Sequence, residues 1–211
     1  MGTPRLEQSA GGVKLVHGAT GKYHGTMPER LHVLGFAGSL RAGSFNRALL
    51  RAAVQLAPEV IEIEIFDLGP LPLYNGDLEA SGFPEPVRHF HERIKAADAL
   101  LIASTEYNFS VSGVLKNAID WASRPPTASP LAGKPAALMG ASTSRMGTVR
   151  SQLHLRQILG STDTLVLTSP YVHVSQPRDK FDADGRLTDE VTRKQVTALL
   201  EEVVAWTRRL Q

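Results

Sequence analysis

The stretch LHVLGFAGSLRAGSFNRALL, residues 31–50, determines the fold because its hydrophobic pattern changes at residue 38. Residues 31–37 form an apolar run typical of a buried β-strand, whereas residues 44–57 carry apolar side chains at helical spacing. The segment between them is polar and contains two glycines. A strand that passes through such a loop into a helix predicts the first unit of an α/β sheet.

The same alternation continues to the end of the chain. Residues 60–67 alternate apolar and polar side chains, as expected near a sheet edge, and residues 99–104 are uninterruptedly apolar, as expected for a central strand. Further strands are predicted at 135–142 and 163–174, and further helices at 84–98, 114–124, 148–160 and 187–210, the last capped by Thr188. These elements predict a doubly wound five-stranded parallel sheet in a three-layer α/β/α domain over residues 31–211. Residues 1–30 are expected to form a polar arm that is flexible or contacts a neighbouring subunit.

Composition narrows the range of functions. A formal net charge of +2 favours neither a nucleic-acid surface nor a membrane surface, so we expect a small-molecule partner. The sequence contains no cysteine, which excludes disulfides, thiol chemistry and Cys-ligated metal centres. A redox role would therefore need an organic cofactor. Because no apolar run is long enough to span a membrane, we expect a cytoplasmic protein.

Three polar loops follow the first, third and fourth predicted strands, at 38–46, 105–112 and 142–148. The first and third contain glycine, and Gly113 directly follows the second. In a parallel α/β sheet the ligand binds beyond the carboxyl ends of the strands, where the strand order reverses. All three loops lie at that edge. We therefore expect them to form one binding site.

The first of these loops is rich in groups that could bind an anion. The donors are the side chains of Ser39, Arg41, Ser44 and Asn46. Gly38 and Gly43 permit close approach or unusual backbone angles, and the helix that begins near Ser44 adds its positive N-terminal end. A phosphate monoester suits this set, although a simple capped turn, with Ser44 as the cap and solvated arginines, is the alternative. The loop is neither a P-loop nor a G-x-G-x-x-G fingerprint, which disfavours ATP and a Rossmann dinucleotide.

Three motifs carry a resemblance to a known family: GSLRAGSFNRALL (38–50), EYNFSVSGVLKNAIDWASR (106–124), and LAGKPAALMGAS (131–142) with HLRQIL (154–159). Together they resemble the NADPH-dependent FMN reductase family, a flavodoxin-like group that includes quinone and chromate reductases. The resemblance implies bound FMN, NAD(P)H as co-substrate, and hydride transfer to quinones or similar acceptors, namely azo compounds, chromate or free flavin. It also implies a homodimer or homotetramer.

The resemblance also implies roles for individual residues. The first loop would bind the FMN phosphate, the second would hold the isoalloxazine ring, and one residue of the third would touch the flavin. The residues concerned are Ser39, Leu40, Arg41, Gly43, Ser44, Phe45 and Asn46 in the first loop, Glu106, Tyr107, Asn108 and Phe109 in the second, and Ser142 in the third. We also expect Tyr74, Arg145 and Met146 on the substrate side, with Arg145 pairing with the 2′-phosphate of NADPH. Because FMN carries the chemistry, no catalytic side chain and no metal is expected.

The chain departs from the family pattern at three places. Thr105 stands where the family usually has proline, Ser112 stands where it often has proline, and RMGT (145–148) replaces a common Gly-Gly pair. The first two departures bear on the rigidity of the second loop. The third bears on the shape of the substrate side.

Other interpretations remain open at this level. One is a flavodoxin-type one-electron carrier, although such carriers are typically very acidic and this chain is slightly basic. Another is a flavodoxin-like interaction domain that binds no FMN. His89 and His91 lie two apart on a predicted helix, so they cannot form an i, i+4 metal pair, and both are expected at the solvated surface.

Overall fold

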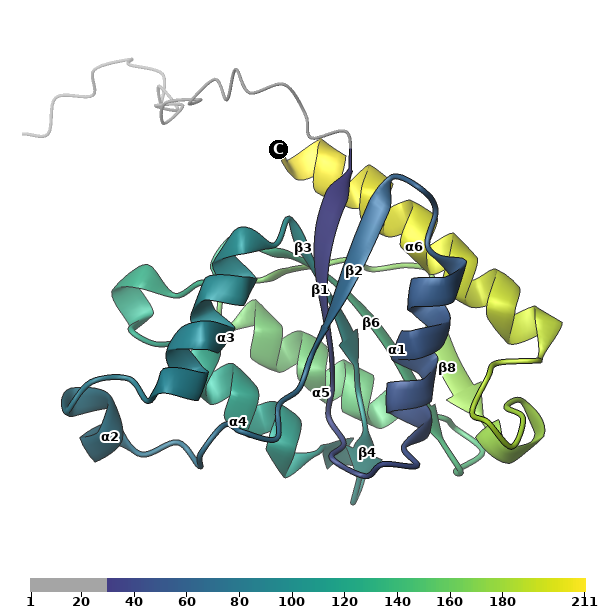
Figure 1. The fold of residues 1–211 in the computed structure, drawn as a ribbon, viewed down its shortest axis with the longest axis horizontal. Coiled ribbons are helices and arrows are strands. Elements are labelled where there is room, and N and C mark those ends of the chain that lie inside the picture. The colour runs from purple at the N-terminus through teal and green to yellow at the C-terminus, as the bar shows by residue number, and fades with distance from the viewer. Residues whose placement is uncertain (1–29) are drawn as a thin grey trace, which may run out of the picture.

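Strand β1 (Leu31–Ala37) occupies the middle of a parallel sheet, between β2 (Ile61–Phe66) and β3 (Ala99–Ala103). A computed structural model describes residues 30–211, and Figure 1 shows their arrangement. Beyond β3 lies β6 (Pro135–Ser142), with which both β7 (Leu165–Val166) and β8 (Val172–Ser175) pair. The order β2-β1-β3-β6-β7 reverses at β1, as in the flavodoxin-like fold, and confirms the predicted fold class.

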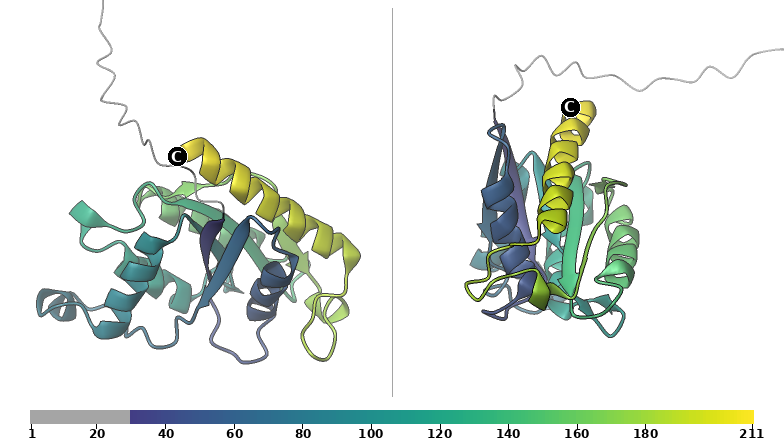
Figure 2. Two further views of the ribbon diagram at one scale, coloured as in Figure 1. Left: turned by 45° about the horizontal axis from the view of Figure 1, so that its top comes forward. Right: turned by 90° about the vertical axis from the view of Figure 1, so that its right-hand side faces the viewer.

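Helices cover both faces of the sheet, as the edge-on view in Figure 2 shows. The helices are α1 (Phe45–Leu56), α2 (Gly76–Ala80), α3 (Glu85–Ala96), α4 (Gly113–Ala122), α5 (Val149–Gly160) and α6 (Glu190–Leu210), with short 3₁₀ turns at Pro126–Ala128 and Pro177–Asp179. Helices α1 and α6 pack on one face and α3, α4 and α5 pack on the other. The result is the predicted three-layer architecture.

Alternation along the central strand β3 supplies both halves of the core. Ala99, Leu101 and Ala103 pack on the side of α1 and α6, whereas Leu100 and Ile102 pack on the side of α3, α4 and α5. All five residues are buried, as the uninterrupted apolar run predicted. Strand β2 lies at the sheet edge, as its alternating pattern indicated.

Two predicted elements differ in detail. The fifth strand is divided into β7 and β8, because the chain leaves the sheet between them and each piece pairs with a different part of β6. Helix α6 is capped by Asp189 and not by Thr188, since an Asp189 carboxylate oxygen accepts from the Thr192 amide at 2.9 Å. A carboxylate is also favourable at the positive end of a helix.

Two elements were not predicted. The short helix α2 begins in the proline-containing segment after β2 and is capped by Asn75. The second loop of the proposed site contains a two-stranded hairpin, β4 (Glu106–Tyr107) with β5 (Ser110–Val111). Both elements are too short to show a hydrophobic period.

The prediction for His91 was wrong, whereas His89 is exposed as expected. His91 is buried, donates from Nε2 to the Trp121 carbonyl at 2.9 Å and packs edge-on against Phe83. Burial lowers the pKa of His91 below its ordinary value, and the bond to the Trp121 carbonyl opposes that shift. Within residues 30–211 no cluster of three or more metal-ligating side chains occurs.

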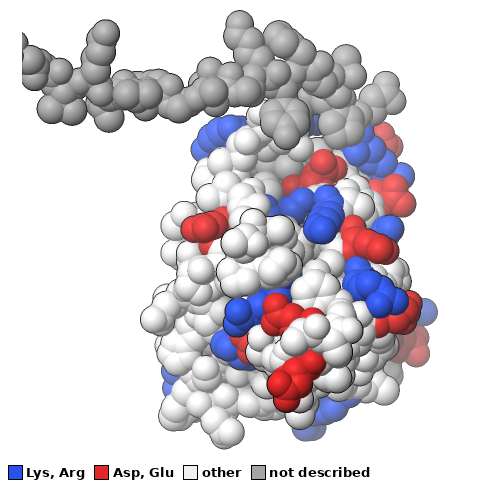
Figure 3. Space-filling model, turned by 90° about the vertical axis from the view of Figure 1, so that its left-hand side faces the viewer, with Lys and Arg blue, Asp and Glu red and all other residues white. Residues whose placement is uncertain are grey.

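The predicted polar segment 1–30 lies outside the described residues, except for Arg30. Among the described helices, none combines the length and apolar character that crossing a membrane requires. Figure 3 shows one face of the molecule, on which acidic and basic side chains are interspersed.

Candidate functional site

The loops after β1, β3 and β6 meet at the carboxyl edge of the sheet and enclose a pocket of about 210 Å³. This edge lies at the bottom of Figure 1, where β4 is beside the loop that leads into α1. The lining residues are Ser39, Arg41, Ser44, Phe45, Asn46, Thr105, Glu106, Tyr107, Ala141, Ser142 and Thr143. Segments distant in sequence therefore converge where a doubly wound fold binds its ligand.

The first loop presents donors at the start of α1. Ser39 and Ser44 are buried and Arg41 is exposed. The Ser44 hydroxyl oxygen accepts from the Arg47 amide at 3.4 Å, so Ser44 is the helix N-cap, as the capped-turn alternative required. Capping uses the oxygen as an acceptor and leaves the hydroxyl hydrogen able to donate. The loop thus combines hydroxyls, a guanidinium and a helix N-terminus, which together suit an anion.

Asn46 lines the pocket and also has a structural role that the sequence did not reveal. Its Nδ2 donates to the Ala141 carbonyl at 2.9 Å and its Oδ1 accepts from the Ala141 amide at 2.8 Å. The side chain therefore pairs with the end of β6 as a neighbouring strand would. Because the amide is engaged at both ends and is buried, Asn46 positions α1 against β6 and has at most one Nδ2 hydrogen left for a ligand.

The two glycines of the first loop also differ from each other. A Cβ at Gly38 would lie 2.6 Å from the Ser112 hydroxyl oxygen and 3.0 Å from the Leu115 Cβ, so close approach explains this glycine. A Cβ at Gly43 would meet nothing within 4 Å among the described residues, and its φ is not left-handed. Neither close packing against the described residues nor a left-handed backbone therefore requires a glycine at position 43.

The tip of the β4–β5 hairpin is strained. Asn108 and Phe109 have φ values of 49° and 66°, the left-handed conformation that a two-residue type I′ turn requires at both central positions. For a bulky residue such as Phe109 this conformation is uncommon and costs free energy. The Arg150 guanidinium lies 3.9 Å from the centroid of the Phe109 ring and holds the turn.

The Glu106 carboxylate links the second loop to α5. One oxygen accepts from Arg150 Nε at 3.0 Å and lies 3.0 Å from Arg150 Nη2 in an ion pair, and the other oxygen accepts from the Ser151 amide at 3.1 Å. Thr148, the N-cap residue of α5, makes no side-chain capping bond, so Glu106 caps this helix from another segment. Because Arg150 and Ser151 lie 44 and 45 residues from Glu106, spacing along the chain does not reveal this role of the carboxylate.

Ser112 provides the rigidity that a proline would have given the second loop. Its hydroxyl donates to the Gly38 carbonyl at 2.6 Å and accepts from the Leu115 amide at 3.3 Å. Ser112 is buried and caps α4. It therefore connects the first and second loops directly.

Three residues of the pocket wall were absent from the sequence-based site, namely Thr105, Ala141 and Thr143. Each of the three is next in sequence to an expected site residue. Their positions directly after β3 or at the end of β6 were therefore the sequence signal that could have identified them. Four expected binding residues, Leu40, Gly43, Asn108 and Phe109, belong to the same loops but do not line the pocket.

The residues expected on the substrate side are not among those that line this pocket. Arg145 and Met146 are exposed in the third loop, whereas its Ser142 lines the pocket. The Tyr74 hydroxyl donates to Glu79 at 2.8 Å and its ring packs edge-on against Trp121. Its backbone amide also donates to the Asn117 side chain of α4, so Tyr74 is held in place by contacts within the protein.

FMN fits the groups that line this pocket. The Thr105 hydroxyl oxygen is buried in the wall and has no hydrogen-bond partner within residues 30–211. The N-terminus of α1 and Arg41 supply positive charge for a phosphate, and the wall also contains Tyr107 and Phe45, which can pack against apolar parts of a ligand.

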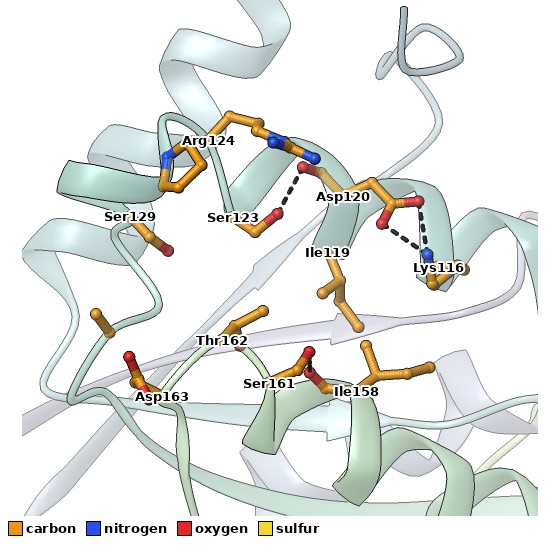
Figure 4. A pocket seen from close by; sticks show the side chains of 12 residues that line it. Lys116, Ile119, Asp120, Ser123, Arg124, Ser129, Ile158, Ser161, Thr162 and Asp163 are labelled. Atoms are coloured by element: carbon orange, nitrogen blue, oxygen red, sulfur yellow. Dashed lines mark hydrogen bonds and ion pairs between the residues drawn. The ribbon is translucent and has the colours of Figure 1, made fainter.

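A larger cavity of about 380 Å³ lies between α4 and α5 near the start of β6, at the opposite edge of the sheet (Figure 4). Several of its polar side chains already bond to the protein: Lys116 pairs with Asp120 at 2.7 Å, and Ser123, Ser161 and Thr162 each donate to a backbone carbonyl. Arg124 also lines this cavity, and its Nε is buried with no partner within residues 30–211, but none of the three loops reaches this cavity. We therefore assign the candidate site to the smaller pocket, where the loops converge.

Comparison with known proteins agrees with this assignment. The family model described as NADPH-dependent FMN reductase matches residues 31–179. An NAD(P)H-dependent FMN reductase of Pseudomonas aeruginosa is 51% identical over 185 residues, which cover 88% of this chain and 100% of that protein. An NADPH:quinone oxidoreductase of Arabidopsis thaliana is 46% identical and covers 86% of this chain and 94% of that protein.

A solved structure gives the same result. The flavoenzyme NAD(P)H:(acceptor) oxidoreductase FerB from Paracoccus denitrificans superposes with a TM-score of 0.79 at 36% identity, over 85% of this chain and 98% of that one. These matches identify an enzyme and set aside the electron-carrier and interaction-domain interpretations. The fold, the three converging loops and these relatives all indicate the same family, so the chain belongs to the NADPH-dependent FMN reductase family.

Proposed function

We propose that this FMN-dependent oxidoreductase passes reducing equivalents from NAD(P)H to quinones, and that the pocket at the carboxyl edge holds its FMN. The observation that carries the proposal is the convergence of the three loops on one pocket. The relative from Arabidopsis thaliana, which is named for quinone reduction, supports the choice of acceptor. Azo compounds, chromate and free flavin are further candidate acceptors.

The first loop would hold the phosphate of FMN. Ser39 and Ser44 would donate hydroxyl hydrogens, Arg41 would supply a full positive charge, and the α1 N-terminus would add about half a charge. These groups are favourable for a phosphate that carries about −1.5 to −2 charges at pH 7.

The second loop would hold the ring. Its hairpin is tied to α5 through Glu106 and to the first loop through Ser112, so the backbone amides near Tyr107 would be preorganised to donate to the polar edge of the flavin. When bound, FMN accepts a hydride from the nicotinamide ring and passes it to the acceptor. The role of the protein is to bind FMN and to orient the nicotinamide ring, and then the acceptor, against the flavin ring.

The exposed apolar side chains at this edge favour a flat acceptor. Tyr107 and Leu40 are each about half exposed, in loops that form the pocket. Such an open surface selects for planarity and stacking more than for particular polar groups. A homodimer or homotetramer would cover part of it, and light scattering of the purified protein measures that state directly.

The experiment is an anaerobic reaction of the purified, FMN-loaded protein with NADPH, followed by steady-state kinetics. We expect loss of the yellow colour on mixing, and faster turnover with a benzoquinone than with an azo dye, chromate or free FMN. Colour that persists with both NADPH and NADH would refute the proposed function. Equal rates with the two nicotinamides would remove the pairing expected between Arg145 and the 2′-phosphate.

Arg41→Ala tests the cofactor site. Loss of one exposed charge-assisted contact is expected to weaken FMN binding by about tenfold, with little change in the melting temperature of the FMN-free protein. Arg186→Ala is the matched control, because this exposed arginine is not among the residues that line the pocket and pairs with Asp182 and Asp184 in its own turn. Equal FMN affinities for the two variants would contradict the assignment of the first loop to the phosphate.

A further inference from the structure

We infer that the side-chain hydroxyl of Thr105 donates a hydrogen bond to the ribityl-phosphate half of bound FMN. The inference rests on the proposed function, since it assumes that the pocket at the carboxyl edge is the flavin site. It assigns a cofactor-binding donor at a position where the family resemblance leads one to expect proline.

The hydroxyl is buried without a partner. Thr105 is 6% exposed, and its Oγ1 makes no hydrogen bond to any of residues 30–211. Buried hydroxyls are normally bonded, because leaving one unsatisfied costs free energy. The neighbouring hydroxyls follow this rule: Ser104 bonds to Ser151, and Ser112 bonds to the Gly38 carbonyl.

Of the unsatisfied buried groups among residues 30–211, one lies at the pocket. The other two such atoms in this part of the chain are Arg124 Nε and Thr207 Oγ1, and neither residue lines the candidate site. Thr105 does line it, between residues of the first and third loops. We therefore expect a ligand in this pocket to be the partner that residues 30–211 do not provide.

The alternation of β3 gives the direction of the side chain. Leu101 and Ala103 pack toward α1 and α6, and the Ser104 amide still pairs with the Met139 carbonyl of β6 at 2.8 Å. The extended pattern thus continues to residue 104, whose hydroxyl meets Ser151 of α5 on the opposite face. Thr105 accordingly falls on the α1 side, where the phosphate is proposed to bind.

The backbone at Thr105 is held in place independently of its hydroxyl. The Thr105 carbonyl accepts from the Ser151 hydroxyl at 3.2 Å. A proline at this position would keep that carbonyl bond but would offer no donor. The threonine therefore adds a donor that the usual family residue lacks.

The test is Thr105→Val, which keeps the shape of the side chain and removes the hydroxyl. We expect the Kd for FMN, measured by flavin fluorescence titration, to rise about tenfold. The melting temperature of the flavin-free protein is expected to stay the same or rise, because an unsatisfied buried group has been removed. Thr105→Ser restores a hydroxyl and is expected to retain most of the FMN affinity.

Titration with flavin fragments locates the bond. A loss of affinity for FMN but not for riboflavin assigns it to the phosphate, and an equal loss for both assigns it to the ribityl chain. An equal loss for lumiflavin, which has neither group, would overturn the inference by placing the bond on the ring.

Two further outcomes would also overturn it. FMN affinity that is unchanged in Thr105→Val would show that the hydroxyl makes no bond to the cofactor. A lower melting temperature of the flavin-free variant would show that the hydroxyl has a partner within the protein. If the wild-type protein bound no flavin, both the proposed function and this inference would be refuted. If the wild type bound FMN and Thr105→Val bound it equally well, the inference alone would be refuted.

Discussion

Replacing Glu106 by Gln should loosen the joint between the second loop and α5. The Glu106 side chain is 5% exposed, accepts one hydrogen bond from Arg150 Nε and one from the Ser151 amide, and forms an ion pair with the Arg150 guanidinium. A glutamine retains one acceptor oxygen, but its amide hydrogens must then face a guanidinium or a helix N-terminus. The variant therefore loses a charge-assisted pair and the charge that favours the start of α5.

The expected cost is about 2 kcal/mol in the free energy of unfolding. Hydrogen bonds to charged groups contribute about 1.5–3 kcal/mol each, and the partly exposed Arg150 reduces the value toward the lower end. For a protein of this length, such a change lowers the melting temperature by about 4–8 °C. FMN binding should weaken as well, because the hairpin that carries Tyr107 is no longer held against α5.

The assay is thermal and urea unfolding of the flavin-free protein, followed by FMN titration. Glu62→Gln is the matched control, since Glu62 pairs with Arg30 at 3.6 Å between two well-exposed side chains and is expected to change stability by less than about 0.5 kcal/mol. If Glu106→Gln and Glu62→Gln shift the melting temperature equally, the reasoning about Glu106 is refuted.

Three other predictions follow from individual contacts. Gly38→Ala is expected to destabilise the fold by about 1–3 kcal/mol through overlap with Ser112, whereas Gly43→Ala should leave the stability of the flavin-free protein unchanged or slightly higher. Loss of stability in Gly43→Ala would contradict this. Asn46→Ala leaves both Ala141 backbone groups without their partner, and a cost of about 2–4 kcal/mol in urea unfolding is expected. Because burial lowers the pKa of His91, the unfolded state binds the proton more readily than the folded state below about pH 6.5, so stability falls as the pH drops. His91→Gln should reduce the slope of unfolding free energy against pH between about pH 7 and 5. An unchanged slope would contradict the argument from burial.

Most of the fold could be predicted from the sequence. The apolar runs at β1, β3 and β6 and the polar loops that follow them indicated the sheet and the edge at which the loops gather, and the alternating pattern of β2 indicated an edge strand. Short elements were missed, because α2 and the β4–β5 hairpin contain too few residues to show a period. The fifth strand was predicted as one run, because a sequence does not reveal where a chain leaves its hydrogen-bonded neighbour.

The sequence predicted the loops of the candidate site and most of the residues that line it, but not the hydrogen-bond partners of individual polar side chains, there or elsewhere in the fold. The sequence indicated all three loops, yet it assigned the Asn46 amide to a phosphate and placed His91 at the surface. Asn46 instead bonds to Ala141, 95 residues away, and His91 bonds to the carbonyl of Trp121, 30 residues away. Neither partner can be inferred from spacing along the chain.

The sequence by itself determined the succession of strands and helices along the chain and the chemical character of each loop. The first depends on the hydrophobic period, and the second on donors that lie close together in the chain. Only the tertiary structure decided which donors remain available to a ligand. Asn46 and Ser112 are committed to distant backbone groups, whereas Thr105 is buried at the pocket with no partner in the described chain. The physical reason is that a buried polar group is satisfied by whatever folding brings beside it, and those neighbours come from segments that the sequence does not place together.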